Sequence, residues 1–406
     1  MFSHATRQSI IERFKNESFD LLVIGGGITG AGIALDAASR GLKTALVEKH
    51  DFAFGTSSRS TKLIHGGLRY LESGQFHLVR ESLLERALML KNAPELVRLR
   101  PFHIPLYQDT RRKPWQIMLG LSMYSVLGGF KRGCRFGVIS KREWSQLDGL
   151  KTDKLKAVFR YYDGQTDDAL LTRAVVQSAI KLGAEVHMPA KFTHAQLHGD
   201  GVRVTYEQNG VSADVDARVL VNATGPWVNH TLKCVAPALP LRSIELVQGT
   251  HLVLPGQVTR GIYYVESPRD GRAVFVMPWY GETLVGTTET RYRGDPEAVK
   301  PLQTEINYLL QVTRHYFPER KATANDIEHS FAGLRVLPAG EGHAFHRPRE
   351  TVFDVDRDNK PRLISIFGGK LTGWRATAEQ VMQHIESSLP ARKRLADTRH
   401  IALHPE

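Results

Sequence analysis

The first strongly patterned part of the chain lies between residues 21 and 48. Four apolar residues at 21–24 are followed at once by three glycines, which predicts a strand buried on both faces that runs into a tight turn. Residues 28–40 are rich in Ala, Ile and Leu without proline, and Gly41 follows where glycine commonly ends a helix, so a helix is predicted there. A second apolar run at 44–47 predicts another strand. The pattern therefore predicts a compact βαβ unit near the start of the chain.

The turn of this unit has the spacing Gly25-x-Gly27-x-x-Gly30. Gly25 permits the turn, Gly27 lets backbone amides approach a pyrophosphate, and Gly30 lets the helix press against the strand. The helix N-terminus offers unpaired N–H groups and the positive end of its dipole. Glu48, about twenty residues on, is the expected acceptor for ribose hydroxyls, and its charge argues against a 2′-phosphate. The unit is therefore predicted to bind a dinucleotide, with FAD and NAD both open.

The rest of the chain alternates between helical and strand-like patterns. A helix is predicted from Gln75 to Leu99, where leucines are spaced for one buried face. Residues 161–168 predict a turn and a helix N-cap, followed by a helix at 169–181. Apolar and alternating runs predict strands at 183–188, 201–207, 211–216, 219–221, 250–254, 273–278, 283–288 and 363–367. Further helices are predicted at 304–316 and 374–385, and hairpin turn chemistry is present at Asn209-Gly210.

The order of these patterns predicts an interleaved fold, because nucleotide-binding patterns return twice after other segments. We expect a discontinuous nucleotide-binding domain, a substrate or membrane-facing lobe, an N-terminal extension and a C-terminal tail. The nucleotide-binding domain comprises residues 19–79, 160–238 and 350–390, and the substrate or membrane-facing lobe comprises residues 80–159 and 239–349. The N-terminal extension is residues 1–18, and the C-terminal tail is residues 391–406. The predicted fold class is α/β, with a Rossmann-like nucleotide-binding domain interleaved with an α+β substrate domain built on an antiparallel sheet.

Length, charge and cysteine content narrow the class of protein. A chain of 406 residues exceeds one comfortable core, so two lobes are expected. The net charge of +12 predicts a surface that attracts anions, such as a phosphorylated substrate or an acidic membrane, while no basic-aromatic module indicates nucleic-acid binding. Cys134 and Cys234 have no paired spacing, which fits a reducing compartment and predicts no metal site. The polar first residues contain no signal-peptide pattern, so export is not expected.

One apolar segment, at residues 115–130, is flanked by the basic clusters 111–113 and 131–132. It falls short of the roughly 18 uninterrupted apolar residues that a helix needs to cross a bilayer. A short apolar patch between cations suits a helix that lies in a membrane interface, with the cations on anionic headgroups. The alternative is a core helix in a buried lobe, and the sequence leaves both open.

Three other segments have the chemistry of a cofactor site. The first is a loop at 55–70, whose hydroxyl groups and lysine can donate hydrogen bonds to a second phosphate or a flavin edge, namely Thr56, Ser57, Ser58 and Lys62. The second is the turn 222–227, where a buried strand ends in Ala-Thr-Gly and can bring backbone against a nucleotide. The third is the glycine turn at 368–373, whose following helix can aim its dipole at the anionic edge of a reduced flavin.

With these motifs in place, the sequence closely resembles the FAD-dependent glycerol-3-phosphate dehydrogenases, which feed electrons to respiratory quinone. The resemblance covers residues 19–385 in order, and its His-Gly-Gly-Leu-Arg-Tyr run is far more specific than a glycine fingerprint. The matching motifs are Gly-Gly-Gly-Ile-Thr-Gly-Ala-Gly at 25–32, Thr56-Ser57-Ser58, Ser60 to Leu71, Asn222 to Trp227, Gly286-Thr287-Thr288, Ile306 to Leu310 and Phe367 to Thr372.

The resemblance implies FAD as the bound dinucleotide and assigns individual residues. Its cofactor contacts fall on Gly25, Gly27, Ile28, Thr29, Gly30, Glu48, Thr56, Ser57, Ser58, Lys62, Leu63, His65, Gly67, Gly225, Gly369, Lys370, Leu371 and Thr372. Its substrate contacts fall on Arg69, Tyr70, His251, Arg335, Arg349 and Lys370. The arginines and the lysine make a site for a phosphate dianion, since guanidinium forks match phosphate oxygens in pairs. His251 is the candidate to take the C2 hydroxyl proton, and Arg335 could instead stabilise the developing alkoxide.

The implied activity is oxidation of sn-glycerol 3-phosphate to dihydroxyacetone phosphate, with membrane quinone as electron acceptor. The implied location is the cytoplasm, peripheral on the inner face of the cytoplasmic membrane, and a homo-oligomer is possible. Three alternatives stay open: an oxygen-using glycerol-3-phosphate oxidase, another FAD-dependent amine or hydroxyacid oxidoreductase, and a catalytically silent flavin-binding partner protein.

The sequence departs from the family in two places. The family usually carries a further helical domain after the last nucleotide-domain helix, whereas this sequence stops at Glu406. The chain also reads Leu371-Thr372-Gly373-Trp374-Arg375 where the family more often has Thr-Thr-Tyr-Arg. The second difference makes an altered substrate scope a hypothesis to test.

Overall fold

The structure is a computed structural model, and it describes residues 18–339 and 351–405. The described chain divides into two compact units, each assembled from segments that are distant in sequence. Unit 1 contains described residues 18–58, 167–246, 335–339 and 351–405, and unit 2 contains residues 59–166 and 247–334. The predicted α/β fold with interleaved parts is confirmed. Residues 59–79, which the hydrophobic pattern grouped with the nucleotide-binding segments, lie in unit 2.

Unit 1 is built on a sheet whose central strands run parallel. Their spatial order is β7 (Glu185–His187), β2 (Thr44–Val47), β1 (Ser18–Ile24), β10 (Val211–Asn222) and β19 (Leu363–Phe367). Strands β1, β2 and β19 are buried along most of their length, which explains their continuous apolar runs. The sheet is extended by antiparallel neighbours: β18 (Val352–Val355) on β19, and β8 (Lys191–His198) and β9 (Gly201–Gln208) beside the first half of β10. The short β11 (Val235–Ala236) completes the edge.

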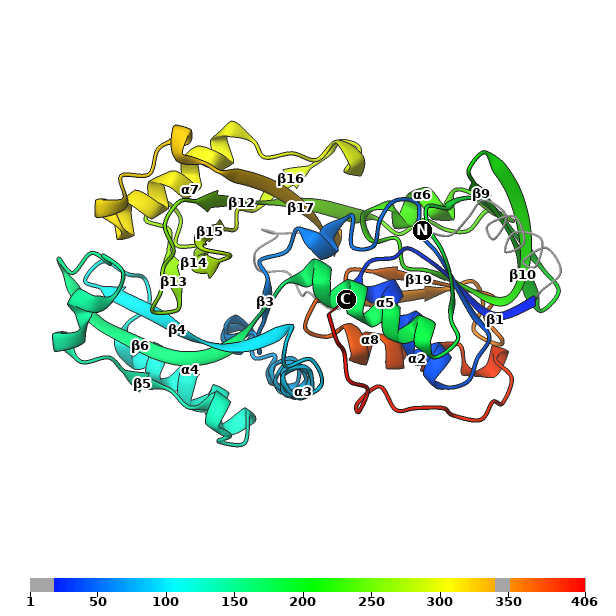
Figure 1. The fold of residues 1–406 in the computed structure, drawn as a ribbon, viewed down its shortest axis with the longest axis horizontal. Helices are drawn as coiled ribbons and strands as arrows, with labels where there is room; N and C mark the ends of the chain where they lie inside the picture. Colours follow the sequence, from blue (N-terminus) through cyan, green and yellow to red (C-terminus); the bar gives the residue numbers. More distant parts are fainter. Residues whose placement is uncertain (1–17, 340–350, 406) are drawn as a thin grey trace. The chain divides into compact units, whose positions relative to one another are not determined.

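Three helices of unit 1 gather together: α2 (Ile28–Ser39) contacts both α5 (Asp168–Lys181) and α8 (Trp374–His384), as Figure 1 shows. Gly32 of α2 lies so close to Trp374 that an added Cβ would stand 2.6 Å from the indole ring. The short α6 (Val228–Leu232) contacts β10 and β19. The predicted βαβ unit and the hairpin at Asn209-Gly210 are therefore confirmed, although 211–216 and 219–221 form one strand rather than two.

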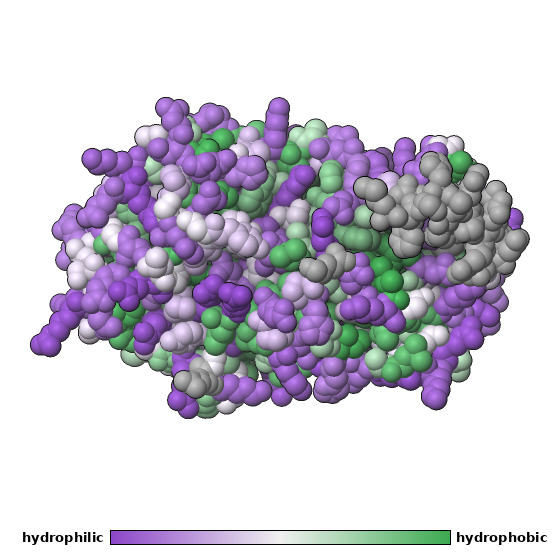
Figure 2. Space-filling view, viewed as in Figure 1, coloured by the Kyte–Doolittle hydropathy of each residue, from purple (hydrophilic) through white to green (hydrophobic). Residues whose placement is uncertain are grey.

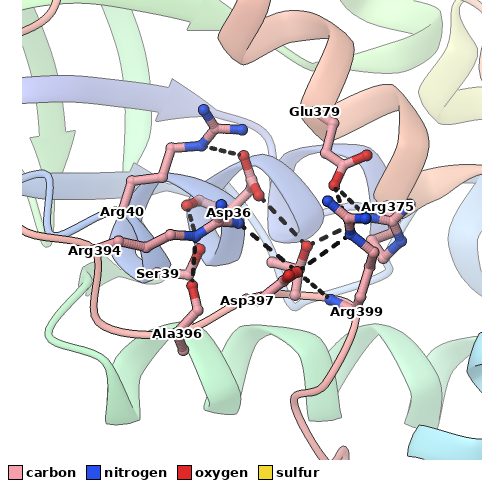
Figure 3. Close-up of polar contacts among 10 residues, drawn as sticks. Asp36, Ser39, Arg40, Arg375, Glu379, Arg394, Ala396, Asp397 and Arg399 are labelled. Atoms are coloured by element: carbon pink, nitrogen blue, oxygen red, sulfur yellow. Dashed lines mark hydrogen bonds and ion pairs between the residues drawn. The ribbon is translucent and has the colours of Figure 1, made fainter.

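The C-terminal segment of unit 1 is tied to these helices by a polar network (Figure 3). The carbonyl of Ser39 accepts hydrogen bonds from the backbone N–H groups of Leu395 and Ala396 at 2.8 and 3.0 Å. Arg375 forms an ion pair with Glu379 at 2.5 Å. Asp36, fully buried in α2, accepts from Arg40 Nε at 2.8 Å. Arg399 also forms an ion pair with Glu379 at 3.8 Å, so residues 395–399 are packed against α2 and α8.

Unit 2 is built on a large, mainly antiparallel sheet, as predicted for the substrate domain. Along its main path the order is β16 (Thr290–Tyr292), β12 (Ile244–Leu254), β15 (Glu282–Gly286), β14 (Ala273–Trp279), β13 (Ile262–Glu266), β4 (Val97–Tyr107), β6 (Leu155–Thr166) and β3 (Leu63–Ile64). Two further strands flank the path, β17 (His329–Pro338) on β12 and β5 (Gly137–Val138) on β6. The helices are α3 (Phe76–Asn92), α4 (Pro114–Leu127) and α7 (Gln303–Tyr316).

Two predictions in this unit are wrong. The helix predicted to Leu99 ends at Asn92, because Pro94 disfavours helical backbone at the residue before it, and β4 begins at Val97. The turn predicted at 161–168 is instead the end of β6, where Asp163 is buried and paired with Arg86 of α3. The helix N-cap predicted in the same stretch is confirmed, because Asp167 accepts hydrogen bonds from the N–H groups of Ala169 and Leu170.

The apolar segment at 115–130 forms α4 and the turn after it. One face of the helix is buried, with Ile117, Leu121 and Tyr124 in the core of unit 2. The other face leaves large apolar side chains at least half exposed: Trp115, Met118, Leu119 and Val126, followed by Phe130. Among the described residues, no helix is long and apolar enough to cross a membrane. α4 thus has one face in the core and one exposed apolar face, and membrane binding by the exposed face stays a proposal.

Candidate functional site

The glycine turn after β1 has the geometry that the spacing predicts. Gly25 adopts φ +107°, and a Cβ there would stand 2.7 Å from the carbonyl oxygen of Ala223. A Cβ on Gly30 would stand 1.9 Å from the carbonyl oxygen of Gly25, so the first turn of α2 rests directly on the backbone of the loop. Only glycine fits at both positions, because any side chain would collide with main-chain atoms.

The other predicted cofactor segments of unit 1 meet this turn at the carboxyl ends of the parallel strands. Gly369, in the turn after β19, lies so near the first turn of α2 that its Cβ would stand 3.2 Å from Thr29 Oγ1. Ser57 lies in the short helix η1 (Thr56–Ser58), and its hydroxyl accepts a hydrogen bond from Ile28 N–H at 2.9 Å. Gly225 opens the turn after β10 with φ +56°. Four segments that are far apart in sequence therefore meet where open α/β sheets bind nucleotides.

Glu48 follows β2 and already supports the turn. Its carboxylate accepts hydrogen bonds from the N–H groups of Gly26 and His50 at 2.6 and 2.7 Å. A carboxylate has about four acceptor positions, so capacity remains for ribose hydroxyls. The first turn of α2 contains no acidic side chain, which leaves its positive dipole end uncompensated. Glycines that allow close approach, the open helix end and the acid after β2 together fit the pyrophosphate and ribose of a dinucleotide.

His251 lies on β12 in unit 2 and is almost fully buried. Its Nε2 is 3.1 Å from the hydroxyl oxygen of Thr61, and its ring is stacked on Phe331 with centroids 4.9 Å apart. Across the sheet it pairs with Gly286, where an added Cβ would stand 2.1 Å from His251 Cδ2. The imidazole is therefore fixed between β15, the 55–70 loop and β17.

Lys62 stands beside this histidine cluster. It has left-handed backbone with φ +61° and is buried, and its Nζ lies over the rings of Trp279 and Phe331 at 5.3 and 5.1 Å from their centroids. Cation–π contacts of this kind are stronger where water is excluded. The loop lysine thus places a positive charge next to Phe331, on which His251 is stacked.

Glu305 of α7 anchors the backbone on both sides of the His251–Gly286 pair. It accepts hydrogen bonds from the hydroxyls of Thr250 and Thr288 at 2.6 and 2.7 Å. Its other donors are Gln248 Nε2, Thr290 Oγ1 and the N–H of Leu302. Burial opposes the charge, but these donors hold the pKa of Glu305 below its usual value. The carboxylate therefore stays ionised and links β12 to the segment between β15 and β16.

The remaining loop residues of unit 2 lie on a short path from β3 to α3. Leu63 pairs with Gln165 in the sheet, and His65 follows β3 directly. Arg69 and Tyr70 lie in the helix η2 (Leu68–Ser73), which begins after Gly67. Gly67 has φ +72°, and the Tyr70 ring folds back so closely that a Cβ on Gly67 would stand 2.2 Å from it.

The predicted phosphate ligands are divided between the units. Arg69 and Tyr70 belong to unit 2 with His251, whereas Arg335 on β17 and Lys370 after β19 belong to unit 1. Leu371 and Thr372 complete the turn before α8, and Gly373 N–H donates to the Lys370 carbonyl at 3.1 Å. Arg349 lies outside the described residues. Neither unit alone contains all of the predicted phosphate ligands, so their joint role in phosphate binding stays a prediction.

Sequence reasoning did not single out several residues that shape the site. Phe331, which stacks on His251, lies in a strand without a distinctive motif, and no sequence signal marks it. Thr61 lay within the recognised loop but had no assigned role. Glu305 sits at the third position of α7, where an acid is commonly read as a helix cap, and its contacts to β12 follow only from the fold.

Comparison with known proteins agrees with this geometry. The family model described as FAD dependent oxidoreductase matches residues 20–378. The chain is therefore an FAD-dependent oxidoreductase, and of the two dinucleotides that the sequence left open, FAD is the cofactor.

The chain is also similar in sequence to individual proteins over most of its length. The chain is 39% identical over 382 residues to aerobic glycerol-3-phosphate dehydrogenase of Escherichia coli (strain K12), which covers 91% of this chain and 74% of that protein. It is also 39% identical over 380 residues to D-erythritol 1-phosphate dehydrogenase of Brucella abortus (strain 2308), covering 92% and 75%. The chain belongs to the family of FAD-dependent glycerol-3-phosphate dehydrogenases.

Solved structures support the same placement. Glycerol-3-phosphate dehydrogenase from Bacillus halodurans, complexed with FAD, has a TM-score of 0.76 and 31% identity, covering 99% of this chain and 71% of that chain. L-alpha-glycerophosphate oxidase from Mycoplasma pneumoniae with FAD bound has a TM-score of 0.75 at 18% identity, which shows a shared fold.

Proposed function

We propose that the protein oxidises sn-glycerol 3-phosphate to dihydroxyacetone phosphate and passes the electrons to membrane quinone. The observation that carries the proposal is the 39% identity, over nine tenths of the chain, to two enzymes that are each named as dehydrogenases of a phosphorylated polyol. The Bacillus halodurans relative of known structure adds a bound FAD at similar overall geometry.

In this proposal His251 accepts the proton of the C2 hydroxyl. When bound, FAD supplies the two-electron acceptor for the hydride that leaves C2. In this assignment Nε2 carries a proton and donates to the Thr61 hydroxyl oxygen, 3.1 Å away, in both the neutral and the protonated imidazole, so Nδ1 is the nitrogen that takes the substrate proton. The stack on Phe331 holds the ring plane, which favours one direction of proton transfer. Arg335 is the alternative group, acting on negative charge that develops on the C2 oxygen.

Arg69, Tyr70, Arg335 and Lys370 bind the phosphate in this proposal. A phosphate dianion needs several fixed donors, and arginine forks bind its oxygens in pairs. The net charge of +12 favours the approach of an anionic substrate. Replacing Arg335 or Lys370 by Ala should raise the glycerol 3-phosphate concentration required about a hundredfold while FAD stays bound.

The test is an anaerobic titration of the purified yellow protein. Glycerol 3-phosphate should bleach the flavin, while glycerol without the phosphate should not. The matched control for Lys370→Ala is Lys181→Ala, since Lys181 is exposed in the last turn of α5 in the same unit. A protein that stays yellow with glycerol 3-phosphate refutes the substrate assignment, and it would be the result expected of a silent flavin-binding protein. Equal kinetics for Lys370→Ala and Lys181→Ala would remove Lys370 from the phosphate site.

D-erythritol 1-phosphate is the second candidate substrate, because an enzyme named for it is as similar as the glycerol-3-phosphate dehydrogenases. It has the same phosphate and one more carbon, so the same cations suit both. Parallel titrations with the two compounds decide between them. The better substrate is the one with the higher ratio of limiting bleaching rate to half-saturating concentration.

Membrane quinone as acceptor is supported by α4. Its apolar face is exposed, and the exposed basic residues Arg111, Lys113 and Lys131 flank it. Hydrophilic residues predominate over much of the face of the molecule drawn in Figure 2. Apolar side chains between cations bind the interface of an anionic bilayer. Steady-state assays with a short-chain quinone and with oxygen separate a dehydrogenase from an oxidase: hydrogen peroxide formed at the quinone rate would overturn the quinone assignment.

A further inference from the structure

Unit 2 contains a buried polar cluster made of Arg86 in α3, Tyr124 in α4, Asp163 in β6 and the backbone N–H of Gly66. The Asp163 carboxylate forms an ion pair with Arg86 Nη1 at 2.5 Å and accepts hydrogen bonds from the Tyr124 hydroxyl at 2.8 Å to both oxygens. Gly66 N–H donates to the Tyr124 oxygen at 3.0 Å and to Asp163 Oδ1 at 3.3 Å. The side chains of Arg86 and Asp163 are only 3% and 1% exposed.

Burying such a pair is costly unless every charge is satisfied, and apolar residues of the same volume often stabilise a core better. Here Arg86 also donates to the carbonyls of Tyr162 and Gly133 at 2.8 and 3.1 Å. The Asp163 carboxylate and the two terminal nitrogens of Arg86 are thus paired, while Arg86 Nε is buried without a hydrogen-bond partner among the described residues. What apolar residues could not reproduce is the contact of the cluster with the Gly66 backbone.

Gly66 lies in the middle of the loop that carries the predicted cofactor and substrate contacts, between His65 and Arg69. An added Cβ on Gly66 would stand 2.3 Å from the Tyr124 oxygen, so the loop backbone is pressed against the hydroxyl. Burial raises the pKa of Tyr124 well above 10, which keeps the phenol protonated and able to donate to Asp163 while it accepts from Gly66.

We propose that Tyr124 and Asp163 are positioning residues that fix the 65–70 loop for substrate binding. The proposal rests on the proposed function of that loop. Tyr124 does not carry a reacting atom in this assignment; its hydroxyl holds the backbone from which Arg69 and Tyr70 project.

The test compares two substitutions that remove the same kind of contact. Tyr124→Phe deletes the hydroxyl that binds Gly66 and Asp163. Tyr263→Phe is the matched control, because Tyr263 is equally buried in unit 2 and its hydroxyl donates to Asp148 Oδ2 at 2.8 Å. The same carboxylate oxygen accepts from the backbone N–H of Arg260, so this hydroxyl also supports a backbone segment through an acid. Both variants are measured as FAD-loaded full-length protein for Tm, for the dependence of the anaerobic bleaching rate on glycerol 3-phosphate, and for the visible circular dichroism of the bound flavin.

We expect similar losses of Tm in the two variants but different kinetics. Tyr124→Phe should raise the half-saturating glycerol 3-phosphate concentration about tenfold, with a smaller fall in the limiting rate and an altered flavin dichroism band, whereas Tyr263→Phe should match the wild type. Equal kinetics and equal spectra in both variants would overturn the proposal.

Failure of the proposed function is a separate result. If glycerol 3-phosphate does not bleach the wild-type protein, the flavin dichroism still compares the two variants: a change confined to Tyr124→Phe supports loop positioning, and no change refutes it.

Discussion

Replacing Gly286 with Ala should slow catalysis roughly a hundredfold without removing the flavin. In the folded chain the added Cβ would stand 2.1 Å from His251 Cδ2 and 2.7 Å from Cγ. Carbon atoms in contact are about 3.5–4.0 Å apart, so the imidazole must move by roughly 1.5 Å. The movement changes both the 3.1 Å contact with Thr61 and the stack on Phe331. A displacement of about 1 Å in a reacting group commonly costs roughly a hundredfold in rate.

The assay is anaerobic stopped-flow bleaching of the flavin with saturating glycerol 3-phosphate. The limiting rate should fall roughly a hundredfold in Gly286→Ala, while the FAD content stays normal because the glycine turn after β1 is unchanged. Gly137→Ala is the control, since Gly137 lies on β5 in the same unit and has open space where a Cβ would be added. A Gly286→Ala enzyme that bleaches at the wild-type rate would refute the assignment of His251 as proton acceptor.

Three further predictions concern cofactor binding, pH and membranes. Gly30→Ala should yield colourless protein, because its Cβ would stand 1.9 Å from the Gly25 carbonyl oxygen; FAD content after purification measures this, and yellow protein would contradict it. Burial lowers the pKa of His187 from 6.5 to about 4, so the stability that depends on its neutral form is present above pH 6.5 and is lost as the pH falls towards 4, because the unfolded chain binds the proton first. At about pH 5 this loss of stability amounts to about 2 kcal/mol. His187→Gln should therefore show a smaller fall in Tm than the wild type between pH 7 and about pH 5. An equal fall in Tm in both proteins would exclude His187 as the cause of the acid destabilisation. Replacing Trp115 and Leu119 of α4 with Ser should abolish co-sedimentation with anionic vesicles but leave anaerobic bleaching unchanged, and undiminished vesicle binding would show that this face is not the anchor.

The elements that local chemistry dictates were predictable from sequence. The βαβ unit, β19 and α7 follow from apolar runs, glycine turns and periodicity within a few residues of their ends. The juxtaposition of Gly369 with Thr29 follows less directly, because it needs the spatial order of β1, β10 and β19.

Of the two wrong predictions, the helix extended to Leu99 overlooked the local effect of Pro94, whereas the turn at 161–168 depended on a partner distant in sequence. Asp163 and its polar neighbours have the composition of a turn, yet Arg86, which lies 77 residues earlier, satisfies the charge and allows a buried strand. The stack of His251 on Phe331 and the anchoring of Thr250 by Glu305 arise in the same way. Propensity and spacing carry no information on such pairs, so their roles emerge only in three dimensions.

The strand order of unit 1 also has a consequence for how the enzyme is made. β1 is synthesised near the start, but its neighbour β10 ends at Asn222, and β19, which completes the parallel sheet, ends at Phe367. The ribosome must therefore release the chain past Asn222 before β1 has both of its neighbours, and past Phe367 before the parallel sheet is complete. We therefore expect flavin loading to follow the synthesis of β19, and a nascent chain halted before residue 363 should not retain the coenzyme.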